Sequence, residues 1–234
     1  NAGLHIVSAG ETGTGKTTTT RGIAAARTHS AHKITVESQA ELLLHEHPDL
    51  YGPWVSSLEA RKANAEGNAE VTMTQLVTST QRMTPDLVIV GEIRGKEIDA
   101  YMSAIEMHQT LCTVHGRTAL GALSNLATYA EFHIGASFAS AMRRMASHLD
   151  VVVCHRKMDD GRRVVSEIVV LDGVSEDGTN PRWERVWAPG PDGRGVVGDL
   201  KVLGAEREER LRAAGFDPSL PDASDPRGLV AVGG

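Results

Sequence analysis

The stretch GETGTGKT, residues 10–17, decides the fold that we expect for this chain. It fits the pattern G-x-x-x-x-G-K-[ST] at every fixed position. An apolar run at Leu4–Ala9 precedes it and indicates a buried strand, and a helical pattern follows it at Thr17–Arg27. Glycines allow the backbone to aim its N–H groups at a phosphate, and the N-terminus of the helix adds positive partial charge. The stretch therefore predicts a site for a nucleoside triphosphate.

The residue types in this loop indicate how a nucleotide would be held. Lys16 supplies a positive charge to the β- and γ-phosphates, and the Thr17 hydroxyl is a ligand for Mg²⁺. ATP and Mg²⁺ are therefore the expected cofactors. The residues expected to bind the nucleotide are Gly10, Glu11, Thr12, Gly13, Thr14, Gly15, Lys16, Thr17 and Thr18.

Two glutamates follow buried strands and are candidates for catalysis. The stretch DLVIVGE, Asp86–Glu92, has four apolar residues and places Glu92 at the C-terminal end of a predicted strand. Ligands of open parallel sheets bind at this end of the strands. Glu92 is expected to hold Mg²⁺, directly or through a water, close to the reacting phosphate. Glu37 ends the run KITVE, residues 33–37, in the same way, so we expect a second carboxylate in the same cleft.

Strands that alternate with helical patterns predict an α/β fold with a mainly parallel, twisted sheet flanked by helices. Together with the GETGTGKT loop, this pattern indicates a fold of the P-loop NTPase type. Toward the C-terminal end, Val151–Cys154 and Val164–Leu171 indicate two antiparallel strands joined by a turn. Thr72 is expected to cap a helix whose apolar positions begin at Met73. Residues 45–70 are polar and are expected to form an irregular surface excursion.

The chain divides into two parts by composition. Residues 1–188 are expected to form one domain, and residues 189–234, rich in Gly and Pro, a largely flexible tail with one short helix at Glu206–Ala214. The chain begins at Asn1 rather than at Met. We therefore expect it to be part of a longer protein with a further domain ahead of it.

Composition excludes several classes of protein. The 234 residues are 41% hydrophobic and carry a net charge of −6, which argues against a protein that coats nucleic acid. Two cysteines, Cys112 and Cys154, cannot form a four-cysteine zinc site, so zinc is not expected. No apolar stretch approaches the roughly 18 residues of a membrane span.

Several motifs together resemble the type II/type IV secretion ATPase family, and most closely its tight-adherence (Flp) pilus assembly branch, the CpaF-like ATPases. The motifs, in chain order, are GETGTGKTTT (10–19), TVESQAEL (35–42), ARKANAEGNAEVT (60–72), RMTPDLVIVGEIRG (82–95), TVHGRT (113–118), the helix with Arg143 and Arg144, and DGRRVVSEI (160–168). The resemblance runs from about Leu4 to Gly173.

The resemblance implies a RecA-like ATPase domain that works in a homo-oligomeric ring, usually a hexamer. Such a ring lies in the cytoplasm on the inner face of the bacterial inner membrane and couples ATP hydrolysis to pilin assembly or protein export through a membrane platform protein. It also implies catalytic roles for four residues. Glu37 would orient or activate the attacking water, Glu92 would be the second carboxylate, near Mg²⁺, His115 would sense the γ-phosphate, and Arg61 would reach toward a phosphate.

Three features depart from the family pattern. Ser38 follows Glu37 where the family usually has Asp, Ser57 stands where an earlier arginine is usual, and the segment before His115 is one residue short. Two other functions therefore stay open. A non-hydrolysing ATP-binding regulator agrees with Ser38 and the shortened segment. A DNA-directed RecA-like motor of conjugation would share the phosphate loop, but the acidic balance and the nine aromatic residues disfavour it.

Overall fold

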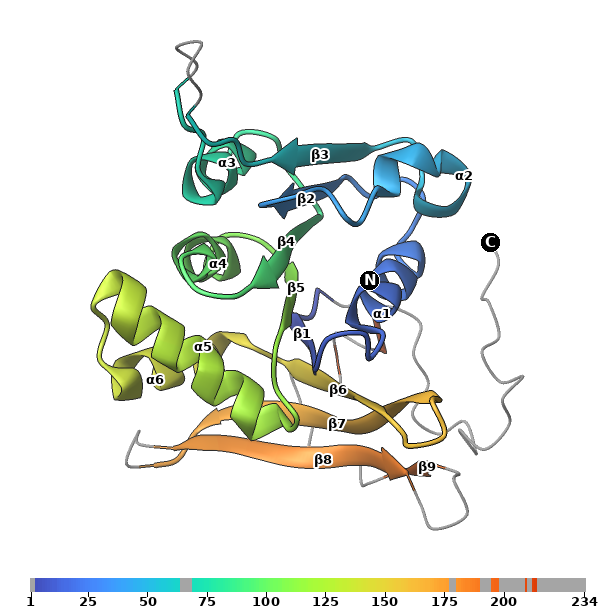
Figure 1. The fold of residues 1–234 in the computed structure, drawn as a ribbon, viewed down its shortest axis with the longest axis vertical. Helices are drawn as coiled ribbons and strands as arrows, with labels where there is room; N and C mark the ends of the chain where they lie inside the picture. Colours follow the sequence, from blue (N-terminus) through green and yellow to red (C-terminus); the bar gives the residue numbers. More distant parts are fainter. Residues whose placement is uncertain are drawn as a thin grey trace.

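The computed structural model describes residues 3–63, 69–176, 180–189, 195–197, 209 and 212–213. One sheet runs through this part of the chain, with the strand order β3-β2-β4-β5-β1-β6-β7-β8-β9 (Figure 1). Its strands are β1 (Ile6–Gly10), β2 (Lys33–Glu37), β3 (Val55–Glu59), β4 (Leu87–Ile93), β5 (Thr110–Val114), β6 (Val151–Lys157), β7 (Arg163–Val174), β8 (Pro181–Pro189) and β9 (Gly195–Val197). The helices are α1 (Lys16–Ala25), η1 (Leu44–Glu46), α2 (Pro48–Tyr51), α3 (Met73–Thr80), α4 (Glu97–Ile105), α5 (Ala119–Ile134) and α6 (Phe138–His148).

The sheet is parallel from β3 through β6, and β7, β8 and β9 each pair antiparallel to their neighbours. This arrangement confirms the predicted α/β class with antiparallel strands toward the C-terminal end. Strand β1 lies inside the sheet between β5 and β6. The GETGTGKT loop therefore follows a central strand and lies at the carboxyl ends of the parallel strands.

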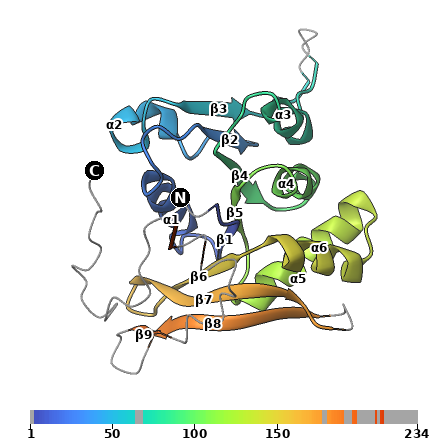
Figure 2. The ribbon, with the colours of Figure 1, turned by 180° about the vertical axis from the view of Figure 1, so that it is seen from behind.

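Two helical layers cover the sheet, one on each face, as the two opposite views show (Figures 1 and 2). Helices α3, α4, α5 and α6 pack on one face around a large apolar cluster that includes Val90, Tyr101 and Leu126. Helices α1 and α2 cover the other face with a smaller cluster that includes Ala24, Tyr51 and Ile89. Strands β2, β4 and β5 are thus buried on both faces, which explains the continuous apolar run of β4.

The start of α3 confirms the predicted cap. The Thr72 side chain accepts a hydrogen bond from the Gln75 N–H at 3.2 Å, and the Gln75 side chain accepts one from the Thr72 N–H at 2.8 Å. This reciprocal capping box satisfies two donors that a helix N-terminus otherwise leaves unpaired. None of the described helices is long and apolar enough to cross a membrane.

The expectation of an irregular excursion at residues 45–70 is wrong for much of that segment. It contains part of η1, all of α2, and strand β3, which pairs parallel with β2 at the edge of the sheet. Beyond β3, Arg61 and Val71 form an antiparallel bridge. The sequence VSSLE of β3 lacks a strong apolar alternation because an edge strand needs only partial burial, and its residues are half-buried or exposed.

The C-terminal part of the sheet is larger than the sequence indicated. Strand β7 continues to Val174, and β8 and β9 extend the antiparallel region beyond it. Most of the tail expected at 189–234 lies outside the described residues. Within the expected helix at 206–214, residues 209, 212 and 213 are described and are helical.

Candidate active site

The loop between β1 and α1 adopts the conformation that a phosphate cradle needs. Gly13 and Gly15 have φ angles of 73° and 104°, in the left-handed region that glycine tolerates best. A Cβ on Gly10 would lie 2.4 Å from the Thr14 hydroxyl oxygen, so only glycine fits there without a shift. That hydroxyl donates to the Glu11 carbonyl at 2.8 Å, which holds the turn closed. The glycines of the predicted motif are therefore explained by backbone geometry.

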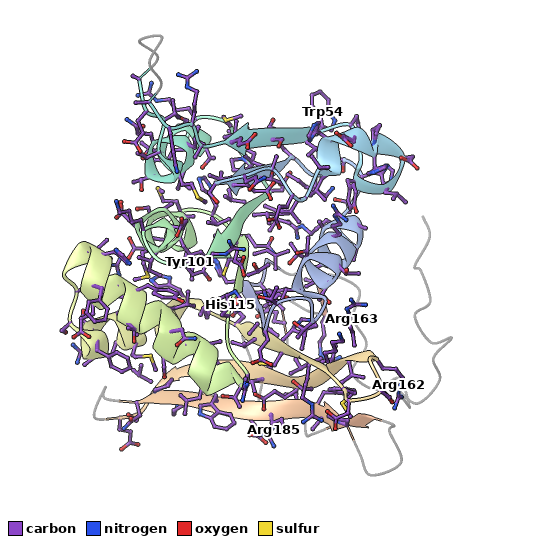
Figure 3. The ribbon with its side chains drawn as sticks, in the orientation of Figure 1. Trp54, Tyr101, His115, Arg162, Arg163 and Arg185 are labelled. Atoms are coloured by element: carbon purple, nitrogen blue, oxygen red, sulfur yellow. The ribbon has the colours of Figure 1, made fainter. Side chains whose placement is uncertain are left out.

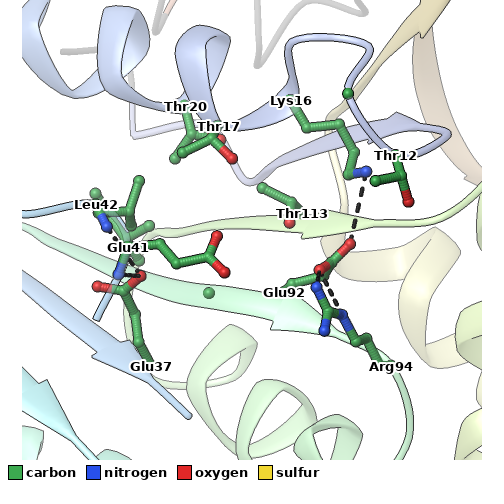
Figure 4. A pocket seen from close by; sticks show the side chains of 13 residues that line it. Thr12, Lys16, Thr17, Thr20, Glu37, Glu41, Leu42, Glu92, Arg94 and Thr113 are labelled. Atoms are coloured by element: carbon green, nitrogen blue, oxygen red, sulfur yellow. Dashed lines mark hydrogen bonds and ion pairs between the residues drawn. The ribbon is translucent and has the colours of Figure 1, made fainter. Parts of the chain in front are cut away.

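Lys16 lies across this loop. Its Nζ donates to the carbonyl oxygens of Gly10 and Glu11 at 2.9 and 3.1 Å and lies 3.5 Å from Glu92 Oε1 (Figure 4). Burial lowers the pKa of the Lys16 ammonium, and the nearby Glu92 carboxylate opposes that shift. The ammonium is thus held where positive charge would meet a phosphate, with a carboxylate as its present counterion.

Glu92 is surrounded by cationic and polar groups. The pairing of β4 with β5 shifts register between Val90 and Glu92, so Gly91 is an extra residue that re-aims the Glu92 side chain. Arg94 forms an ion pair with Glu92, and His115 Nε2 lies 3.0 Å from Glu92 Oε1. The structure therefore brings Lys16, Glu92 and His115 together.

Glu37 is a buried carboxyl at the end of β2. Its Oε1 accepts hydrogen bonds from the N–H groups of Glu41 and Leu42 at 3.1 and 3.2 Å. Its Oε2 has no hydrogen-bond partner among the described residues. Burial raises the pKa of Glu37, although the two N–H donors partly oppose the shift. A Cβ on residue 91 would lie only 3.1 Å from Glu37 Cγ, so Gly91 also makes room for this side chain.

Lys16, Glu37, Glu92 and Arg94 line one pocket of about 240 Å³ between α1 and the ends of β2 and β4, and His115 lies beside Glu92 outside this lining (Figure 4). Its lining is Thr12, Gly13, Lys16, Thr17, Thr20, Glu37, Glu41, Leu42, Ile89, Gly91, Glu92, Arg94 and Thr113. The expected Mg²⁺ ligands Thr17 and Glu92 both belong to it. Mg²⁺ usually takes only one or two protein oxygens and completes its shell with water and phosphates. A hydroxyl and a carboxylate beside a phosphate cradle fit this ion.

Other predicted residues lie around the pocket or away from it. Glu11 is exposed and pairs with Arg117, and Thr18 is exposed on α1. Arg61 is exposed beyond β3, where its guanidinium donates to the Ala69 carbonyl at 3.2 Å. It does not line the pocket of its own chain. Its predicted role at a phosphate stays a prediction.

The absence of zinc stays a prediction. The structure places no group of three or more His, Cys, Asp or Glu residues that could hold a metal ion within the described part of the chain. Cys112 and Cys154 are buried and free, and burial raises the pKa of both thiols to about 12. They are protonated core groups at neutral pH.

Three residues near the site were not found from the sequence. Thr20 and Thr113 line the pocket. His155, on β6, lies behind the phosphate loop, with Nδ1 2.9 Å from the Ala9 carbonyl oxygen and Nε2 2.8 Å from the Thr19 hydroxyl. No local pattern marks His155, because the loop residues that it contacts lie far from it in the sequence.

Comparisons with known proteins agree with this architecture. The profile of the family described as Type II/IV secretion system protein matches residues 1–182. A Mycobacterium tuberculosis (strain H37Rv) protein named as a candidate conjugal transfer protein is 34% identical over 181 residues, 73% of this chain and 47% of that protein. The type IV secretion system protein VirB11 of Brucella suis is 38% identical over 92 residues, 39% of this chain and 24% of that protein.

Solved structures show the same fold. The crystal structure of the Brucella suis VirB11 ATPase in complex with sulphate superposes with a TM-score of 0.59 at 26% identity, over 70% of this chain and 47% of that one. The Legionella pneumophila ATPase DotB gives 0.52 at 23% identity, over 75% of this chain and 47% of that one. This chain thus spans about half the length of its mycobacterial relative and of both ATPases. It has the RecA-like fold of the secretion ATPases and belongs to the type II/IV secretion system ATPase family.

Proposed function

We propose that this chain is the ATP-hydrolysing domain of a bacterial secretion or pilus-assembly motor. One observation carries the proposal: Glu37 and Glu92, from two different strands, line the same pocket as Lys16 and Thr17 of the phosphate loop. A cradle alone would suit any nucleotide-binding protein. Two carboxylates beside it also supply groups that can orient a water for attack.

The proposed chemistry divides between the loop and the carboxylates. Lys16 and the loop N–H groups bind the phosphates of ATP, and Thr17 and Glu92 would hold Mg²⁺. When bound, Mg²⁺ neutralises phosphate charge. Glu37 orients the attacking water and accepts its proton, a role that a raised pKa favours near neutral pH. His115, beside Glu92, would sense the γ-phosphate.

The assembly in which this domain works is also part of the proposal. We expect a homo-oligomeric ring, a hexamer in this proposal, in the cytoplasm at the inner face of the bacterial inner membrane, acting on a platform protein. The CpaF-like, tight-adherence branch is supported by the segments at 60–72 and 160–168. Arg61 lies away from the pocket of its own chain, and we propose that it serves the pocket of a neighbouring copy.

Phosphate release from Mg-ATP by the purified protein tests this function. The wild type should release phosphate, and Lys16→Ala should abolish both nucleotide binding and release. Phe132→Ala is a matched control, because Phe132 is exposed on α5 and does not line the pocket. A wild-type protein that binds ATP in its assembled form and releases no phosphate would instead support the non-hydrolysing regulator.

A DNA-directed motor is the second candidate, since the mycobacterial relative is named for conjugal transfer. Such a motor should bind single-stranded DNA at physiological salt, and DNA should stimulate its ATPase. We expect neither effect, because the net charge of the chain is −6. Stimulation of several-fold by DNA would replace the secretion motor with this candidate.

A further inference from the structure

A contact between the β6–β7 hairpin and the phosphate loop stands apart from the carboxylate pocket. Arg163, the first residue of β7, donates from Nε to the Gly13 carbonyl at 2.7 Å, across a sequence separation of 150 residues. Its Cδ lies 3.8 Å from the position that a Cβ on Gly15 would occupy. The guanidinium stem therefore lies against both glycines whose left-handed backbone shapes the loop (Figure 3).

A second, buried contact anchors the same hairpin to the loop. His155, eight residues earlier on β6, bonds the Ala9 carbonyl and the Thr19 hydroxyl on the two sides of the loop. Cys154 pairs with Glu167 and His155 with Val165, so β7 carries an extra residue at Ser166, and such a bulge bends the strand that carries it. Burial lowers the pKa of His155, which favours a neutral ring at neutral pH. The buried His155 thus joins the hairpin to the phosphate loop, and this contact helps to position Arg163 beside the loop.

The bonding of Arg163 leaves most of its donors available. A guanidinium has five N–H donors and a permanent positive charge. Within the described part of the chain, Arg163 makes the one hydrogen bond to Gly13 and no ion pair. Its neighbour Arg162 instead pairs with Asp160 in the turn, 2.7 Å away. An exposed cation with free donors, held against a phosphate cradle, matches a polyphosphate ligand.

We propose that Arg163 is a further nucleotide-binding residue, supplied by the same chain as the phosphate loop. Its Nε holds the Gly13 carbonyl outward, and its terminal N–H groups bind a phosphate of the nucleotide in the cradle. This role rests on the proposed function only in requiring that the loop binds Mg-nucleotide. It also links the nucleotide to the antiparallel strands β7 and β8.

The test compares Arg163→Ala and Arg163→Lys with Arg162→Ala, which removes the same charge one residue away. Binding is measured in Mg²⁺ with a fluorescent ADP analogue and by competition with inorganic tripolyphosphate, which has no base or sugar. Arg163→Ala should weaken both affinities about tenfold, the effect of losing one charge-assisted hydrogen bond. Arg163→Lys should recover part of the loss, and Arg162→Ala should stay within about twofold of wild type.

Three results separate this inference from its alternatives. Equal affinities for Arg163→Ala and Arg162→Ala would overturn it, because a general charge effect would then suffice. A loss for the ADP analogue without a loss for tripolyphosphate would also overturn it, because the contact would then be to base or ribose. A wild-type protein that binds neither ligand would defeat the proposed function itself. Thermal melting of each variant confirms that the fold is retained.

Discussion

Burial of the Glu37 carboxyl lowers the stability of the fold when the group is ionised, and the same burial suits a group that accepts a proton in the pocket. The carboxyl is almost fully buried, one oxygen accepts two N–H bonds, and the other has no partner among the described residues. Because burial raises its pKa, the native state holds the Glu37 proton more tightly than the unfolded chain does. Its contribution to stability is therefore present below the unfolded pKa and is lost as pH rises through the native value.

Glu37→Gln removes this titration. Turnover should fall about 100-fold, since a positioned general base contributes at least that much. The difference in melting temperature between Glu37→Gln and wild type should increase in favour of the variant from pH 4 to pH 8. The increase should be about 2 °C if ionised, buried Glu37 costs the native state about 1 kcal/mol. Paired melting curves at both pH values measure this difference. A difference that is independent of pH would show that Glu37 has an ordinary pKa.

At the scale of elements, the loop after β2 is held by hydrogen bonds with two side chains, Glu37 of β2 and Arg21 of α1. The N–H groups of Glu41 and Leu42 bind Glu37, and the carbonyl oxygens of the same two residues accept hydrogen bonds from Arg21 of α1, at 2.7 and 3.1 Å. Leu43 follows with a left-handed φ of 47°, which closes the turn. Helix α1, which carries Lys16 and Thr17 at its start, thus also positions Glu37.

Arg21→Ala should release this loop and lower kcat about tenfold, because small displacements of a catalytic group reduce turnover strongly. Nucleotide affinity should stay within about twofold of wild type, since Arg21 does not line the pocket. Arg27→Ala is the matched control, because Arg27 also donates to a backbone carbonyl, that of Asp86, away from the pocket. Steady-state phosphate release and equilibrium binding separate the two effects. Equal losses of kcat in both variants would mean that general loosening of α1 is responsible.

The elements also show what the sequence could predict. The strands buried on both faces, such as β2 and β4, and the capped helix α3 carry local signals, and all were expected. Strands β3 and β8 lie near the sheet edges and have exposed residues, so their sequences resemble loops. Glu37 and Glu92 could be found because each lies at or near the end of a strand that the sequence predicts. His155 and Arg163 could not, since their contacts depend on how β6 and β7 pair beside β1.

At the scale of the whole molecule, the site lacks the arginine that the family resemblance implies. Arg61 projects from the segment beyond β3, at the edge of the sheet, and binds the Ala69 carbonyl rather than a pocket residue. In a ring, the edge of one copy would lie against its neighbour. The proposed arrangement therefore makes hydrolysis depend on assembly and on protein concentration.

Mixing two inactive variants tests this arrangement. Lys16→Ala lacks a working cradle and Arg61→Ala lacks the proposed arginine, so each alone should have almost no turnover. Mixed rings place an intact Arg61 beside an intact cradle at some interfaces, and phosphate release should reappear in the mixture. A mixture as inactive as its parts would contradict action of Arg61 on a neighbouring copy, and an Arg61→Ala protein with full activity would place Arg61 outside the reaction.

The central claim is that the phosphate loop binds Mg-ATP while the carboxylates of the same pocket drive its hydrolysis. The most direct measurement is the binding and single turnover of Glu92→Gln beside Lys16→Ala and wild type. We predict that Glu92→Gln binds Mg-ATP within about threefold of wild type and slows its conversion to ADP at least about 100-fold, whereas Lys16→Ala does not bind. Wild-type conversion of bound ATP by Glu92→Gln would contradict the account.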